Sequence, residues 1–196
     1  YGKACALLEL AGCWRQGALL RLSPREAKAT KARALFVRAC RGGAAMGCLY
    51  LAEMERLGEG GPKDTTSATR RYARLCEGGL KQACNDLGVA QQPHSAADAA
   101  ATFRKSCDAG SQLACANLGV LLVKKGEVVE AVPYLQLACQ RHEASACVQL
   151  AVLYETGRGG TKADATRAAM LYQRACKGGH EDGCSGLALL LFLGKG

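Results

Sequence analysis

The chain has 196 residues, a formal net charge of +9 and only 5% aromatic residues, with Trp14 as its single tryptophan. No stretch approaches the ~20 consecutive apolar residues of a transmembrane helix, so we expect no membrane span in this sequence. Nucleic-acid-binding proteins usually add aromatic platforms or a known motif to a basic surface, and this chain has neither, so we expect no nucleic acid partner.

Twelve cysteines dominate the sequence, and they form six pairs whose members are always eight residues apart. The first members stand at positions 5, 40, 76, 107, 139 and 176, at intervals of 31 to 37 residues. A fixed spacing that recurs with such a period predicts one structural unit repeated along the chain. The pairs are Cys5/Cys13, Cys40/Cys48, Cys76/Cys84, Cys107/Cys115, Cys139/Cys147 and Cys176/Cys184.

Each repeat begins with an expected helix that ends near the first cysteine of its pair. Eight residues before that cysteine stand Ala32, Ala68, Ala99, Ala131 and Ala168. Four residues before it stand Tyr1, Phe36, Tyr72, Phe103, Leu135 and Tyr172. Positions four and eight apart share one helical face, so this pattern predicts a buried packing face. Pro133 would cost about 3 kcal/mol inside such a helix, so we expect that helix to start late or to bend.

Basic residues recur two positions before the first cysteine, at Lys3, Arg38, Arg74, Lys105 and Arg174. Cations at this position complement the dipole at the end of a helix, and their stems cover apolar surface. Much of the basic excess is therefore a repeated feature of the helices. An acidic peptide or an anionic cell-wall component stays a candidate partner.

A corner and a second helix follow in each repeat. The residues between the paired cysteines include Gly42-Gly43, Gly78-Gly79, Ala109-Gly110, Arg141-His142 and Gly178-Gly179. Glycine accepts the positive φ of a helix C-terminal cap, and histidine is found there with some frequency, so we expect the chain to reverse at each corner. The segment from Cys5 to Cys13 has no such glycine. An apolar residue three positions after the second cysteine, followed by alanine or glycine, predicts a second helix with a notch for a neighbouring backbone.

The spacing of the cysteines also predicts how they pair. Eight residues along one helix rise about 12 Å, whereas a disulfide needs Cα atoms within roughly 7 Å. A bridge within one helix is therefore excluded, and chain reversal at the corner predicts one bridge in each of the six pairs. Two alternatives stay open, namely buried thiols that act as small hydrophobic residues and a zinc site, although zinc ligands usually stand two to four residues apart. Twelve evenly paired cysteines favour an oxidising compartment.

The repeat from Leu150 to Cys176 resembles a known family. Its segment LAVLYETGRGG at 150–160, with Asp164, Ala168 and Tyr172 after it, resembles the Sel1-like repeat, and the paired cysteines resemble the Helicobacter cysteine-rich protein branch of that family. The resemblance implies an all-α fold, a right-handed superhelical solenoid of antiparallel helix pairs similar to tetratricopeptide repeats, with one disulfide at each helix–turn–helix corner. It also implies a secreted or periplasmic adaptor, and some members carry a penicillin-binding or weak β-lactamase label.

No domain boundary is visible, so we expect residues 1–196 to form a single solenoid. Tyr1 aligns with the aromatic position of the first helix, and Gly194-Lys195-Gly196 align with Gly157-Arg158-Gly159. The chain thus begins and ends inside a repeat, and we expect it to be a fragment of a longer protein.

Catalytic motifs are absent from the sequence. There is no Ser-x-x-Lys, no Gly-x-Ser-x-Gly, no phosphate-binding loop and no His-Glu-x-x-His, and a hydrolase needs an activated nucleophile with a base in reach. We therefore expect no catalytic residue, no cofactor and no metal. A weak β-lactam-binding hydrolase is the alternative implied by the family label. A mitochondrial intermembrane-space assembly factor is the third, although the richness in alanine, arginine and glycine favours a bacterial source.

Binding is the function that the repeat pattern favours. Positions near the start of the second helix change identity between repeats while the framework does not, and by analogy with tetratricopeptide repeats they would hold an extended peptide on a concave face. These residues are Tyr50, Asn85, Asp86, Asn117 and Gln149. The alternative is that they are ordinary solvent-facing positions. We expect Tyr50→Ala with Asn117→Ala to weaken capture of the partner without loss of stability, and the oligomeric state stays open.

Overall fold

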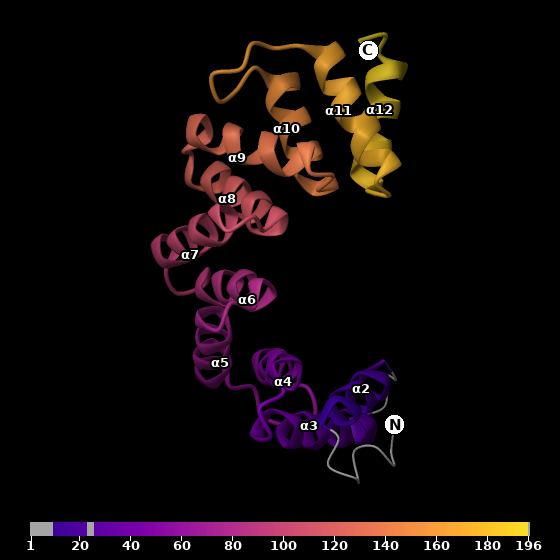
Figure 1. Ribbon diagram of the computed structural model, residues 1–196. Helices are drawn as coiled ribbons and strands as arrows, with labels where there is room; N and C mark the ends of the chain where they lie inside the picture. Colours follow the sequence, from indigo (N-terminus) through magenta and orange to yellow (C-terminus); the bar gives the residue numbers. More distant parts are fainter. Residues whose placement is uncertain (1–9, 23–25, 196) are drawn as a thin grey trace. The chain divides into compact units, whose positions relative to one another are not determined.

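The computed structural model describes residues 10–22 and 26–195, and every regular element in these ranges is an α-helix (Figure 1). The chain divides into two compact units, residues 1–95 and 96–196. The first unit contains α2 (Leu10–Arg21), α3 (Glu26–Arg41), α4 (Ala45–Leu57), α5 (Thr65–Glu77) and α6 (Lys81–Gln91). The second contains α7 (Ala96–Asp108), α8 (Gln112–Lys125), α9 (Val128–Gln140), α10 (Ala144–Thr156), α11 (Ala165–Lys177) and α12 (Glu181–Phe192).

Consecutive helices pack against each other within each unit, as the repeat pattern predicts. The first helix of a repeat ends one residue after the first cysteine, as α3 and α5 do, and the second helix begins three residues before the second cysteine, as α4 and α6 do. Second helices of successive repeats also touch, because α2 contacts α4, α8 contacts α10 and α10 contacts α12. In the described part of each unit, successive first helices are not packed on one another to this extent. Room is therefore left between them.

Disulfides join the two helices at five corners. They are Cys40–Cys48, Cys76–Cys84, Cys107–Cys115, Cys139–Cys147 and Cys176–Cys184, with Cα atoms 4.4 to 4.7 Å apart. The predicted Cys5–Cys13 bridge involves Cys5, which lies outside the described residues. These findings confirm the predicted all-α array of Sel1-like helix pairs with a disulfide at the corner. The hand of the superhelix and the single continuous domain stay predictions.

Small side chains allow the two helices of a corner to approach this closely. A Cβ atom added to Gly47 would lie 2.5 Å from the Cβ of Ala39, and one added to Gly183 would lie 2.6 Å from the Cβ of Ala175. The same position, directly before the second cysteine, holds a fully buried alanine in the other described repeats: Ala83, Ala114 and Ala146. A larger residue there would separate the helices and strain the disulfide geometry.

The corners use the left-handed backbone conformation that the sequence predicts. Gly43, Gly79, Gly110 and Gly179 have φ between 81° and 90°, and His142 occupies the same position with φ 68°. Other residue types pay a steric penalty there, because the Cβ atom approaches the following carbonyl oxygen.

Pro133 does not delay its helix. α9 starts at Val128 and continues through Pro133 to Gln140, so the expectation of a late start is wrong. Val128 and Ala131 are both buried. Their burial stabilises the turn before the proline and offsets the lost backbone hydrogen bond.

The predicted notch in the second helix receives a side chain of the next repeat. A Cβ atom on Gly17 would lie 2.8 Å from Cε1 of Phe36, and one on Gly119 would lie 2.6 Å from Cδ2 of Leu135. Phe36 and Leu135 occupy the large position of the following first helix, and both are fully buried. The notch therefore serves side-chain interlocking between repeats. At Gly119 the expected close approach of a backbone is also present, because the backbone nitrogen of Leu135 would lie 3.4 Å from the added Cβ atom.

Gly119→Ala is expected to lower the free energy of unfolding by about 1–3 kcal/mol, since the new methyl group would overlap Leu135. Urea unfolding followed by far-UV circular dichroism measures this. In the background of Leu135→Ala the same change is expected to be neutral or stabilising, because alanine forms helices better than glycine. An equal loss in both backgrounds would contradict the interlocking contact.

His142→Gly is expected to raise the free energy of unfolding by about 1 kcal/mol, because glycine adopts positive φ without the steric penalty. The matched change is Gly110→Ala at the same corner position one repeat earlier, which is expected to lower it by a similar amount. Thermal melts of both variants provide the comparison. A destabilised His142→Gly protein would show that the imidazole makes a contact that outweighs the backbone strain.

Candidate functional site

Tyr50 is a core residue as much as a surface one. Its ring stacks on Phe36 with centroids 5.1 Å apart and on Trp14 with centroids 6.0 Å apart. It packs against the buried cluster that contains Ala32 and Met54. The structure thus corrects the expectation that Tyr50→Ala would leave stability unchanged, because truncation removes these ring contacts.

Asn85 and Asp86 form a local pair on α6. Asn85 is only 6% exposed, and its Nδ2 donates to Oδ1 of Asp86 at 3.4 Å. Burial raises the pKa of Asp86 above its ordinary value; the hydrogen bond from Asn85 and the charge of Arg56 oppose this rise, and the charge of Glu53 adds to it. Asn85 therefore orients Asp86, and only Asp86 of the two is partly open to solvent.

Asn117 and Gln149 lie on α8 and α10 in the second unit, and both are half-buried. Tyr50, Asn85 and Asp86 belong to the first unit. A common binding surface formed by all five residues stays a prediction.

A groove between first helices is the feature that the sequence did not reveal. It has a volume of about 450 Å³ and opens over α3, α4 and α5. We call it the arginine groove; its lining consists of Val37, Cys40, Arg41, Cys48, Leu51, Arg71, Arg74 and Leu75. A smaller hollow of about 210 Å³ adjoins it, shares Arg71 and Arg74, and adds Ser67 and Arg70.

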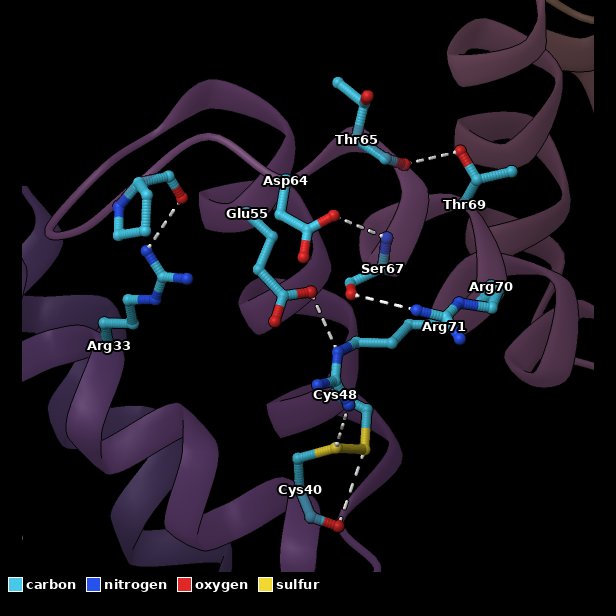
Figure 2. A network of polar contacts seen from close by, with 11 residues as sticks. Arg33, Cys40, Cys48, Glu55, Asp64, Thr65, Ser67, Thr69, Arg70 and Arg71 are labelled. Atoms are coloured by element: carbon cyan, nitrogen blue, oxygen red, sulfur yellow. Dashed lines mark hydrogen bonds and ion pairs between the residues drawn. A yellow bond between two sulfur atoms is a disulfide. The ribbon is translucent and has the colours of Figure 1, made fainter.

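Arg71 is held in place inside the arginine groove. Its Nε donates to Oε2 of Glu55 at 2.8 Å, and its Nη1 lies 3.8 Å from Sγ of Cys40, as Figure 2 shows. Glu55 is only 6% exposed, and a buried carboxylate is costly unless a counter-charge accompanies it. Arg71 therefore neutralises the buried Glu55, and this ion pair fixes its position across the groove.

Arg41 and Arg74 are different, because both side chains are exposed. Neither makes an ion pair or a side-chain hydrogen bond within the part of the chain that the structure describes. Arg70 in the adjoining hollow donates to Oγ of Ser67 at 3.4 Å. The rim thus carries two guanidinium groups, those of Arg41 and Arg74, that have no carboxylate of the described chain at ion-pair distance.

An equivalent groove exists in the second unit, over α9, α10 and α11. It has a volume of about 380 Å³, and we call it the second groove; it is lined by Gln136, Cys139, Gln140, Leu150, Tyr154, Arg167, Met170, Leu171 and Arg174. Counted from the cysteines, both grooves have a cysteine and a leucine at the same positions of the floor, Cys40 with Leu51 and Cys139 with Leu150. The two grooves are therefore the same structural feature in two repeats.

The rims of the two grooves differ. Val37, Arg41 and Arg71 of the arginine groove correspond to Gln136, Gln140 and Leu171 of the second groove, while Arg74 corresponds to Arg174. In the second groove Nη2 of Arg174 donates to the carbonyl oxygen of Gln140 at 3.0 Å. The second groove is consequently less cationic.

The buried partner of the rim changes together with it. Glu55 corresponds to Tyr154, so the Glu55–Arg71 ion pair is replaced by the apolar neighbours Tyr154 and Leu171. Arg167 lies over the Tyr154 ring, 5.2 Å from its centroid. Both combinations fill the same space, one with charge and the other with aromatic surface.

The chemistry available in these grooves is binding. Neither lining contains a carboxylate or an imidazole that could act as a general base, and arginine remains protonated at any physiological pH. Among the described residues, no group of three histidine, cysteine, aspartate or glutamate side chains is arranged to hold a metal ion. No helix in the ranges 10–22 and 26–195 is long and apolar enough to cross a bilayer.

The repeat alignment contained a signal for the rim. Arg74 and Arg174 stand two residues before the first cysteine, a position that the sequence analysis assigned to the helix dipole. The alignment could not show that the neighbouring first helix lies far enough away to leave a groove.

Asp86→Asn is expected to stabilise the protein at neutral pH. Because the pKa of Asp86 is raised by burial, the contribution of this carboxyl to stability is present at acid pH and is lost as the pH rises through the raised pKa. The gain from the variant should therefore vanish in acid, which urea unfolding at both pH values measures. The control is Asp64→Asn, since hydrogen bonds from Ser67 lower the pKa of Asp64 and give the opposite pH dependence. A loss of stability for Asp86→Asn at neutral pH would contradict the burial penalty.

No protein-family model and no curated protein matches this chain. Solved structures do. A protective antigen of uropathogenic Escherichia coli, described as displaying an SLR fold, matches with a TM-score of 0.76 at 25% identity over 92% of this chain and 41% of the antigen chain. A Sel1 repeat protein from Oxalobacter formigenes matches with a TM-score of 0.77 at 22% identity, over 95% and 78% of the two chains. The immunity protein Pa5087 from Pseudomonas aeruginosa matches with a TM-score of 0.62 at 20% identity, over 89% and 68%.

The chain spans less than half of the Escherichia coli antigen. Its similarity to these structures extends over nearly all of its own length, and they share its array of helix pairs. Its own repeat carries a disulfide at each of the five described corners. The chain therefore has the fold of the Sel1-like repeat proteins.

Proposed function

We propose that the protein is a non-catalytic scaffold that binds a protein partner outside the cytoplasm. The observation that carries the proposal is the pair of equivalent grooves, in which the floor is kept and the rim is changed. Repeat arrays that recognise partners keep the residues that build the framework and vary those that make contact. A groove with three arginines and a groove with two arginines, two glutamines and a tyrosine would recognise different chemistry.

The disulfides support both parts of the proposal. Each closes a short loop, which is worth about 2–3 kcal/mol in the chain-entropy model. Such bridges persist in oxidising compartments, which favours a secreted or periplasmic protein. By linking the helices at each corner they would also lower the ordering cost of binding.

The structural neighbours point the same way. One is named a protective antigen and another an immunity protein, and all three reported above come from bacteria. These names support a protein partner and a bacterial source for this chain. Asp86, Asn117 and Gln149, on the second helices, remain candidates for an additional contact surface.

Site-specific photo-crosslinking tests the scaffold function. Benzoylphenylalanine is introduced at Val37 or at Gln136, which occupy equivalent positions in the two grooves. The control position is Val129, which is exposed on α9 and lies outside the lining of the second groove. Irradiation in the source organism is expected to give a protein adduct from at least one groove position and none from Val129. The adduct is expected in the extracytoplasmic fraction. The cysteines of this protein are expected to resist alkylation until the disulfides are reduced.

Three kinds of result would contradict the proposal. Equal labelling from all three positions, or from none of them, would remove the grooves as binding sites. Hydrolysis of a chromogenic cephalosporin that survives repurification would favour the β-lactam-hydrolase alternative instead. Full alkylation of the native protein without reduction would place it in a reducing compartment.

A further inference from the structure

We propose that the arginine groove between α3 and α5 binds an acidic peptide segment, with an aliphatic side chain on its floor and carboxylates at Arg41 and Arg74. The proposal rests on the scaffold function and names the chemistry of the partner at one of its two grooves. It commits to a peptide and not to an anionic polymer.

The positive charge of the groove favours a ligand that carries carboxylates. The two adjoining hollows are lined by Arg41, Arg70, Arg71 and Arg74 and by no aspartate or glutamate. Two carboxylates reach into this region, namely Glu55, which is buried against Arg71, and Asp64, which caps α5 at Ser67 and lies near Arg70. Arg41 and Arg74 therefore remain without a carboxylate at ion-pair distance among the described residues. Glu77, three residues after Arg74 on α5, is exposed and makes no ion pair with it.

Arginine is suited to this role because its planar fork can form two parallel hydrogen bonds with one carboxylate. Arg41 is the last residue of α3, and Arg74 lies near the end of α5. Both line the same hollow, so two acidic residues that flank an aliphatic residue of a peptide could each meet one guanidinium. The repulsion between the unpaired arginines would be relieved when such a peptide binds.

The floor of the groove favours a ligand with an apolar side chain. Val37, Leu51, Leu75 and the Cys40–Cys48 disulfide form it. A volume of about 450 Å³ accommodates several side chains of a peptide. A polyphosphate or a sulfated polysaccharide has no group that would replace water over this surface. Single-stranded nucleic acid would need aromatic residues on which bases could stack, and this lining contains none.

The second groove shows that the cationic rim is not required by the fold. The same framework is built there with Gln140 in place of Arg41 and Leu171 in place of Arg71. Arg174, which corresponds to Arg74, is engaged by the carbonyl oxygen of Gln140. The unpaired arginines of the first unit are therefore a property of that groove and not a consequence of helix packing.

Fluorescence anisotropy with a defined probe tests the proposal on the oxidised protein. The probe is a short fluorescein-labelled peptide in which leucine alternates with glutamate. Three competitors accompany it, namely the same peptide with glutamine in place of glutamate, polyglutamate of equal length, and dextran sulfate. The probe is expected to bind and to be displaced by its unlabelled form, much less by the glutamine peptide and only weakly by polyglutamate or dextran sulfate.

Matched variants locate the site. Arg74→Gln and Arg41→Gln are each expected to weaken binding of the probe about tenfold or more, since each removes a charged hydrogen bond. Arg38→Gln is the control, because Arg38 has the same repeat position as Arg74 and is equally exposed but does not line the groove. It is expected to leave the affinity nearly unchanged. Unfolding curves of all three variants should superimpose on that of the parent protein.

Each opposite outcome overturns the proposal. Equal weakening by Arg38→Gln would mean attraction to net charge alone, and displacement by dextran sulfate as effective as by the peptide itself would assign the groove to a polyanion. No binding of the probe would exclude an acidic peptide at this groove. The scaffold function would still stand if the crosslinks at Val37 or Gln136 form, so the two proposals fail separately.

Discussion

The close approach of two helices at each disulfide corner is the constraint on which the rest of this structure depends. Cα atoms 4.4 to 4.7 Å apart require glycine or alanine before the second cysteine and a residue with positive φ in the turn. Once the corner is built, the second helices within each unit pack against the first helices next to them in the chain, and the large residue of one repeat enters the notch of the previous one. The first helices are left apart, and the grooves open between them over the disulfides.

The interior of each repeat tolerates very different chemistry at one pair of positions. In the first unit the pair is Glu55 with Arg71, a buried carboxylate with its counter-charge at 2.8 Å. In the second unit it is Tyr154 with Leu171. Replacing only one member would leave either a buried charge without a partner or a polar group against apolar surface, and both are costly. The two positions therefore have to change together, and the rim of the groove changes with them.

Charge is distributed in the first unit at some cost to stability. Burial raises the pKa of Asp86 with Glu53 adding to the shift, so the charged form of this carboxyl is destabilising in the folded protein. Natural proteins retain such costs mainly where function requires them. The disulfides offset them by lowering the entropy of the unfolded chain. A helical array stabilised by disulfides can thus tolerate surface charges that would unfold a less stable array.

The sequence by itself determined the repeat, the helix–corner–helix order, the pairing of the cysteines at the described corners and the left-handed residue at each turn, including His142. These features depend on local spacing and on backbone sterics, which act over a few residues. Only the tertiary structure decided that Tyr50 belongs to a core, that Asn85 is buried, and that Arg41, Arg71 and Arg74 line one groove. Residues some 30 apart come together there because α4 packs against both α3 and α5, and no periodicity in the sequence shows that these two first helices leave a groove between them.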